Sequence, residues 1–352
     1  MSEPMTTAMD GRRYLRLVPD GGRLCAVVAQ VSPWTGREAR AVIAPSVVGV
    51  CRSDLRELAG VRAVRRDFGH EIVGRVVAAE PAALHCLVEA PAVCLDPHVA
   101  LTRTSGFGEL VEIVAPVEAV ALALRPLPSP LSNALGIFVE PMACASHCVA
   151  RALTSPAPAR HADGRVAVVG AGIAGTLIAL NLEATDFEVD VFNRSSARLD
   201  VLREHGVFPS AALHRLAKAE RRYQTVIVAT TRLTPETLQW AFDAIADGGT
   251  VVLYAGTTPG VPVDDMDVDS IRRDQRSITV ERGGRKVQLV GTHGAQAADF
   301  DRATDLLQQE GDNAPKTRLA RLLGPELTLD EALIELPRHA HSGFVGKAYV
   351  RL

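Results

Sequence analysis

Two side chains of the kinds that bind transition metals, Cys51 and His70, lie 19 residues apart, and His70 is followed directly by Glu71. Thiolate, imidazole and carboxylate groups are the usual zinc ligands in proteins, and a catalytic zinc takes three of them and keeps one position open. A separated cysteine and histidine are by themselves more often structural than metal-binding. The local sequence around them therefore has to support a metal site.

A second pattern that indicates ligand binding is the glycine motif Gly170-Ala171-Gly172-Ile173-Ala174-Gly175. It follows an apolar run, residues 166–169, and opens an apolar helical stretch. The first glycine permits a tight turn, the second lets backbone approach a pyrophosphate, and the third lets helix and strand pack closely. The helix start, which contains Ile173 and Ala174, faces the phosphate charge. The pattern predicts a dinucleotide site; the alternative is an ordinary glycine-rich turn.

The end of the next predicted strand indicates which dinucleotide is bound. Enzymes that use NAD usually place an acidic residue there against the ribose 2′-hydroxyl, whereas this chain has Asn193, Arg194 and Ser195. Arg194 can pair with a 2′-phosphate, and Asp190 lies too early, within the strand. The sequence favours NADP(H) over NAD(H). The alternative is a solvated Arg194 and an enzyme that uses NAD.

The elements that must hold these residues form two groups. Short β-rich runs broken by Gly, Pro and charged residues predict a compact, mostly β domain in the first third; they are residues 23–31, 39–50, 71–80, 110–116 and 118–124. Residues 131–152 have helical spacing, and 154–164 look like a linker. Strands and helices then alternate from residue 165, which predicts a doubly wound parallel sheet.

Composition limits the functional classes. The chain has 352 residues, enough for two domains, and a formal net charge of −3, so it offers no basic field for nucleic acid or an anionic membrane. No run approaches the roughly 20 apolar residues of a membrane span, and no secretory signal pattern is seen. Six scattered cysteines do not resemble a disulfide framework. We expect a cytoplasmic protein that acts on a small molecule.

In several segments the chain resembles the zinc alcohol dehydrogenases of the medium-chain dehydrogenase/reductase superfamily, and more narrowly the sorbitol and related polyol dehydrogenases. The similar segments run in order over nearly the whole chain: VGVCRSDL, FGHEIVGRV, CLDPHV, SGFGELV, FVEPMACASHCVAR, VAVVGAGIAGTLIALNL and VQLVGTHG. The resemblance implies one catalytic zinc. Cys51 and His70 match its first two ligands, and Glu140 of the EPMACA motif matches the third.

The resemblance also implies roles for the neighbours of these ligands. Glu71 matches a glutamate that can ligate the zinc directly or through water. The alternative is that it contacts the ligands and not the metal. Asp54 matches the carboxylate that orients the zinc-bound histidine. Ser53 matches a hydroxyl that passes the substrate proton towards solvent. Arg52 sits where some relatives place an arginine against the cofactor pyrophosphate, and a solvated arginine fits equally well.

The resemblance breaks where many relatives carry a structural zinc held by four cysteines. The corresponding stretch, residues 94–108, has one cysteine, so we expect no structural zinc. Nearby side chains suited to metals are expected to serve packing or to support the ligands: Cys94, Cys144, Cys148, His98 and His147. The basic cluster Arg62, Arg65 and Arg66 is expected to be a surface loop, the alternative being a contact with an anionic substrate group.

Together these features predict an α/β protein. A GroES-like, mostly β catalytic domain is expected over residues 13–152 and 298–352, with a Rossmann domain over 153–297. The expected reaction is reversible hydride transfer between NAD(P) and a secondary alcohol or ketone, on a polyol, sugar or (amino)cyclitol, in a homo-oligomer. Two alternatives stay open: a zinc-free NADPH-dependent reductase of the same superfamily, and a non-catalytic NADP-binding protein.

Overall fold

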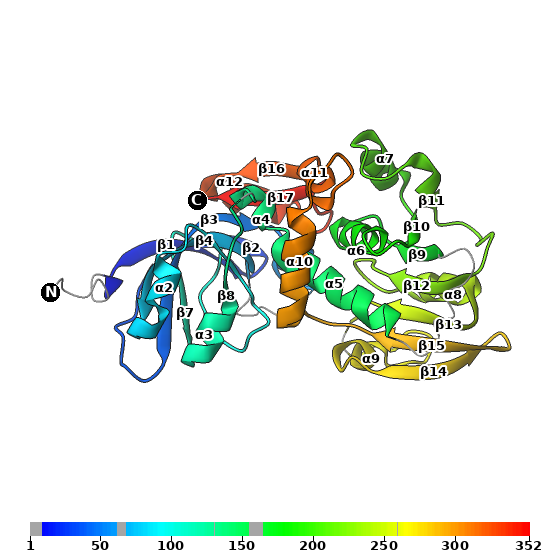
Figure 1. Ribbon diagram of the computed structural model, residues 1–352, viewed down its shortest axis with the longest axis horizontal. Helices are drawn as coiled ribbons and strands as arrows, with labels where there is room; N and C mark the ends of the chain where they lie inside the picture. The colour runs from blue at the N-terminus through cyan, green and yellow to red at the C-terminus, as the bar shows by residue number, and fades with distance from the viewer. Residues whose placement is uncertain (1–8, 62–67, 130, 155–164, 259) are drawn as a thin grey trace. The chain divides into compact units, whose positions relative to one another are not determined.

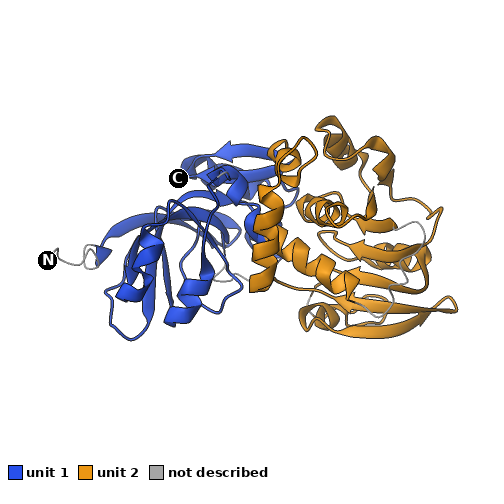
Figure 2. Cartoon of the chain, viewed as in Figure 1, with its two compact units in different colours: residues 1–140, 322–352 blue, residues 141–321 orange. Residues whose placement is uncertain are grey.

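A computed structural model describes residues 9–61, 68–129, 131–154, 165–258 and 260–352 of the chain (Figure 1). The basic cluster Arg62, Arg65 and Arg66 lies outside these residues. The chain divides into two compact units (Figure 2). Unit 1 comprises residues 1–140 and 322–352, and unit 2 comprises residues 141–321. No helix among the described residues is long and apolar enough to cross a membrane.

Unit 1 is built on an eight-stranded sheet and a separate hairpin. The hairpin is β1 (Arg13–Asp20) with β2 (Arg23–Gln30). The sheet runs β16-β17-β3-β4-β5-β8, with β7 added beside β3 and β6 beside β7. Its strands are β3 (Ala39–Gly49), β4 (Glu71–Glu80), β5 (Val93–Leu95), β6 (Thr102–Arg103), β7 (Val111–Ala115), β8 (Leu124–Pro126), β16 (Leu323–Leu327) and β17 (Lys347–Arg351).

The core of unit 1 lies against this sheet and contains apolar side chains from both parts of the chain, including Ile43, Ile72, Phe107, Leu336 and Val350. Short helices cover it: α1 (Arg52–Leu58), η2 (Ala82–Leu84), α2 (His85–Val88), α3 (Val117–Ala123), α4 (Asn133–Gly136) and α12 (Leu329–Arg338). Because β17 pairs with β3, the end of the chain lies beside the strand that leads to Cys51.

Unit 2 is a doubly wound sheet in the order β11-β10-β9-β12-β13-β15-β14. All its neighbouring strands are parallel except the pair β14–β15. The strands are β9 (Arg165–Val169), β10 (Glu188–Asn193), β11 (Leu213–Arg215), β12 (Tyr223–Val228), β13 (Ile245–Leu253), β14 (Ser277–Arg282) and β15 (Arg285–Gly291). The chain order reverses between β9 and β12, the point at which sheets of this type bind ligands.

The helices of unit 2 are α5 (Val139–Leu153), which begins in unit 1, α6 (Ile173–Glu183), α7 (Ser196–Glu204), η3 (Ser210–Ala212), α8 (Pro235–Ala244), α9 (Val268–Arg273), α10 (Ala297–Gln308) and α11 (Pro315–Ala320). The alternation of strands and helices expected from residue 165 onwards is therefore present.

One strand expected in the first part of the chain is wrong. Most of residues 118–124 belong to helix α3, whose buried Val120 and Ala123 are three residues apart, a helical spacing.

The unit boundaries differ from those expected from the sequence. They fall at 140/141 and 321/322 instead of near 152 and 298. Buried polar contacts within unit 2 give the reason: His147 of α5 lies with its Nδ1 2.9 Å from Oδ2 of Asp299 in α10, and with its Nε2 2.6 Å from Oε1 of Gln275. These contacts join α5 to α10 and to the segment between α9 and β14, all within unit 2.

Candidate functional site

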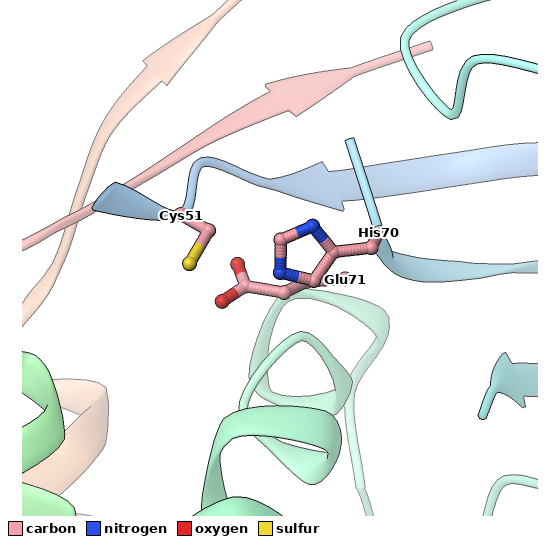
Figure 3. A group of neighbouring side chains, drawn as sticks. All are labelled: Cys51, His70 and Glu71. Atoms are coloured by element: carbon pink, nitrogen blue, oxygen red, sulfur yellow. The ribbon is translucent and has the colours of Figure 1, made fainter. Parts of the chain in front are cut away.

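Cys51, His70 and Glu71 meet at one end of the unit 1 sheet. β3 ends just before Cys51, His70 directly precedes β4, and the antiparallel register pairs Gly49 with Glu71. The ligand atoms of the three side chains all lie within 4.8 Å of one another. Figure 3 shows the sulfur, the imidazole and the carboxylate converging. His70 and Glu71 are buried, and Cys51 is partly exposed.

Two glycines make this close approach possible. A Cβ atom at Gly49 would lie 2.3 Å from Oε2 of Glu71. Gly69 adopts a φ of +63°, in the left-handed region, and a Cβ there would lie 2.7 Å from the ring of Phe107. A side chain at either position would displace a candidate ligand or strain the turn that presents it.

Asp54 ties together the two segments that carry Cys51 and His70. Its carboxylate accepts hydrogen bonds from the backbone N–H of Cys51 and of Gly69, both at 2.9 Å. Its Oδ1 also lies 3.5 Å from Nδ1 of His70. Asp54 is almost fully buried. One carboxylate thus joins the segments of Cys51 and His70 and lies close to the ring of His70.

The charges around the cluster perturb the titration of its members. Burial works to lower the pKa of His70, but the nearby Asp54 and Cys51 outweigh it and raise that pKa well above its ordinary value. Burial raises the pKa of Glu71, and Lys347 works in the opposite direction. Lys347 is itself buried and forms an ion pair with Glu71.

Lys347 was not identified from the sequence. It begins β17, and the hydrogen bond from the Val50 backbone N–H to the Ala348 carbonyl, 2.9 Å, continues the β3–β17 pairing beside Cys51. The sequence signal that could have identified it is a lysine within the largely apolar C-terminal segment GFVGKAYVRL. Its partner lies 276 residues earlier.

Glu140, which the resemblance matches to the third zinc ligand, is not in the cluster of Cys51, His70 and Glu71. It lies in the first turn of α5, and its Oε1 is 2.9 Å from Nε2 of His98. Its charge nevertheless acts on the cluster, because it contributes to raising the pKa of Glu71. The structure therefore brings Cys51, His70 and Glu71 together and places Glu140 against His98.

Ser53 and Arg52 follow Cys51 at the start of α1. The hydroxyl of Ser53 is buried and has no hydrogen-bond partner within the described ranges. The guanidinium of Arg52 donates to the carbonyl oxygens of Ala340, at 3.4 Å, and His341, beyond the end of α12. Arg52 is thus held by the C-terminal segment of unit 1.

The donor types fit a zinc ion. Cys51 offers sulfur, His70 a ring nitrogen and Glu71 a carboxylate, which are zinc's usual ligand atoms. Their ligand atoms lie within 4.8 Å of one another, close enough for one ion to contact all three. Cys94 and Cys148 are buried, and His147 contacts Asp299 within unit 2. His98 and Cys144 form a second group with Glu140, whose ligand atoms all lie within 4.8 Å of one another.

The glycine motif of unit 2 forms the turn that the sequence predicts. Gly170 has a φ of +125°, and a Cβ there would lie 2.7 Å from the carbonyl oxygen of Ala229 after β12. Gly172 is the N-cap of α6, and Ile173 and Ala174 form its first turn. A Cβ at Gly175 would lie 1.8 Å from the carbonyl oxygen of Gly170. The turn therefore needs glycine at positions 170 and 175 for close packing.

The end of β10 lies against this turn. Oδ1 of Asn193 accepts a hydrogen bond from the Ala171 backbone N–H at 3.2 Å, and its Nδ2 donates to the Ser195 carbonyl at 2.9 Å. Arg194 is exposed, and Ser195 is the N-cap of α7. Arg198 of α7 also approaches the turn, since a Cβ at Gly172 would lie 3.0 Å from its Nη1.

Comparison with known proteins agrees with this architecture. Residues 165–317 match a family profile described as the NAD binding domain of 6-phosphogluconate dehydrogenase. No curated protein sequence matches the chain. Solved structures match over nearly its whole length. One from Sinorhizobium meliloti 1021, described as a zinc-binding dehydrogenase bound to NADP, is 19% identical, with a TM-score of 0.67 and coverage of 97% of this chain and 99% of that chain.

Two Escherichia coli structures are similar to the same extent. L-idonate 5-dehydrogenase is 16% identical, with a TM-score of 0.68 and coverage of 97% of this chain and 98% of that chain. Galactitol-1-phosphate dehydrogenase is 15% identical, with a TM-score of 0.68 and coverage of 96% and 100%. The chain has the fold of these dehydrogenases. The expected fold class, a sheet-rich domain with a Rossmann-like domain, is confirmed, and the profile match supports NAD(P) binding by unit 2.

One prediction concerns Asp54. Asp54→Ala removes the acceptor of two backbone N–H groups, and each buried donor left without a partner costs about 1–3 kcal/mol. We expect a lower Tm and zinc binding weakened about 10- to 100-fold, because the segments of Cys51 and His70 lose their common anchor. Thermal unfolding and zinc titration measure the two effects. Asp54→Asn keeps one acceptor oxygen and should be intermediate, whereas an alanine variant equal to wild type in both would contradict the prediction.

Proposed function

We propose that this chain is a zinc-dependent, NAD(P)-linked dehydrogenase that interconverts a secondary alcohol and a ketone. The observation that carries the proposal is the convergence of Cys51, His70 and Glu71 within 4.8 Å in a chain whose second unit has a dinucleotide-binding fold. Zinc is the metal that this mixture of sulfur, nitrogen and oxygen ligands favours.

The residues of the chain have distinct roles in this proposal. Cys51 and His70 hold the metal, with Glu71 and Glu140 as the carboxylates available to it. Asp54 keeps the ring of His70 in place. A metal bound there supplies Lewis-acid polarisation of a substrate oxygen, and the nicotinamide accepts or donates the hydride. Ser53 moves the proton, because a hydroxyl can both accept and donate, and its Oγ has no partner in the part of unit 1 that the structure describes.

The substrate class is proposed as a polyol, sugar or (amino)cyclitol. The names of two similar structures, L-idonate 5-dehydrogenase and galactitol-1-phosphate dehydrogenase, support it. So does Glu140 at the position where sorbitol-type enzymes have a glutamate. The proposal includes one zinc per chain and no structural zinc, because residues 94–108 contain Cys94 as their single cysteine.

The test combines metal analysis with turnover. Purified protein is assayed for zinc and then for oxidation of polyols, cyclitols and simple secondary alcohols with NAD and NADP. We expect about one zinc per chain and activity that a chelator removes and zinc restores. Reduction of activated double bonds without zinc would point to a zinc-free reductase. Nucleotide binding without turnover on any of these substrates would point to a non-catalytic protein.

Arg194 provides a prediction about the cofactor. A charged hydrogen bond contributes about 1.5–3 kcal/mol, so Arg194→Gln should raise KM for NADP about 10-fold and leave KM for NAD nearly unchanged. Steady-state kinetics with both cofactors measures this difference. Arg203→Gln, on the exposed side of α7, is the matched control. A wild-type enzyme that prefers NAD would refute the role of Arg194.

A further inference from the structure

His98 contacts the candidate ligand Glu140, and the sequence leaves open whether it serves packing or supports the ligands. It follows β5, and its backbone N–H donates to Oδ1 of Asp96 at 2.9 Å. Asp96 is buried. β5 pairs antiparallel with β4 through Cys94 and Val73, so the turn after β5 that carries His98 lies at the same end of the sheet as His70 and Glu71, at the start of β4.

The ring of His98 contacts Glu140. Its Nε2 lies 2.9 Å from Oε1 of the carboxylate, and the side chain of Glu140 is 8% exposed while that of His98 is 28% exposed. A buried carboxylate needs a partner, and an imidazole N–H that donates to an ionised carboxylate forms a strong, short hydrogen bond. A carboxylate has two oxygens with several lone pairs, so it can accept a hydrogen bond and ligate a metal at the same time.

We propose that His98 is a positioning residue of the metal centre, which holds Glu140 so that its carboxylate can join Cys51, His70 and Glu71 as a ligand. This inference rests on the proposed zinc-dependent function. Partners that hydrogen-bond a metal ligand fix its orientation, and their loss typically weakens metal binding 10- to 100-fold. His98 would act in this way on a carboxylate, as Asp54 does on His70.

The test compares His98→Leu with His98→Gln in the full-length protein. Zinc affinity is measured by competition with a chromophoric chelator, and Co²⁺ added to the metal-free protein reports the ligand set through its visible absorption. We expect His98→Leu to bind zinc about 10- to 100-fold more weakly while its saturated Co²⁺ spectrum keeps the wild-type shape. The amide of Gln can replace the donor, so His98→Gln should bind within a few-fold of wild type.

His85→Leu, a change at an exposed histidine of α2, is the matched control and should bind zinc as wild type does. Unchanged zinc affinity in His98→Leu would overturn the proposal. So would an equal loss in the Leu and Gln variants together with an altered Co²⁺ spectrum, because His98 would then be a ligand itself. A wild-type protein that binds no zinc would overturn the proposed zinc-dependent function as well. A wild-type protein that binds zinc, with unchanged affinity in His98→Leu, would overturn the role of His98 alone.

Discussion

Cys51→Ala is expected to release the zinc and to lower kcat/KM for alcohol oxidation about 1,000-fold. The thiolate is the one sulfur ligand of the proposed centre, and Lewis-acid stabilisation of a developing charge is worth several kcal/mol, of which each 1.36 kcal/mol is tenfold in rate. Metal content per chain and steady-state kinetics measure both losses. NADP binding should be retained, because the glycine motif lies in unit 2, outside the unit that carries Cys51.

Cys148→Ala is the matched control. Cys148 is fully buried in α5, and burial raises the pKa of its thiol. We expect this variant to lose some stability through a small cavity and to keep its zinc. A Cys51→Ala protein that still holds one zinc per chain would show that the metal, if present, is bound elsewhere.

Gly175→Ala is expected to disrupt the dinucleotide site. The added Cβ would lie 1.8 Å from the carbonyl oxygen of Gly170, so α6 must move away from the turn after β9. Overpacking against backbone should cost about 3 kcal/mol, roughly 6 to 12 °C in Tm for a unit of this size. We also expect NADP to bind at least about 10-fold more weakly, since the helix start and the turn no longer face the same phosphate. Thermal unfolding and fluorescence titration with NADPH are the measurements.

Gly172→Ala distinguishes an effect on stability from an effect on NADPH binding. Its added Cβ would meet the far end of the Arg198 side chain at 3.0 Å, which can move aside. The variant should therefore keep a Tm near that of wild type, while the methyl group at the predicted pyrophosphate position weakens NADPH binding. If Gly175→Ala bound NADPH as tightly as wild type, the turn would not be the phosphate site.

The features that could be predicted from the sequence are those encoded locally. The glycine motif, the strand before it and the helix after it lie within about 20 residues, and the alternation of strands and helices beyond residue 165 follows from periodicity. Cys51, His70 and Glu71 could be selected because their residue types and flanking segments indicate zinc chemistry. Residues 118–124 show the limit: a seven-residue apolar run does not distinguish a strand from a helix, and α3 formed there.

The tertiary structure alone decided which side chains face the candidate ligands. Lys347 reaches Glu71 because β17 pairs with β3, which in turn pairs with β4. His98, in the turn after β5, reaches Glu140 in the first turn of α5. These partners are 276 and 42 residues apart. It also decided that α5 from Pro141 onwards and all of α10 belong to unit 2, where His147 contacts Asp299. Hydrophobic periodicity determines which face of an element is buried, but the element that covers this face depends on strand register and long-range packing, which no local pattern encodes.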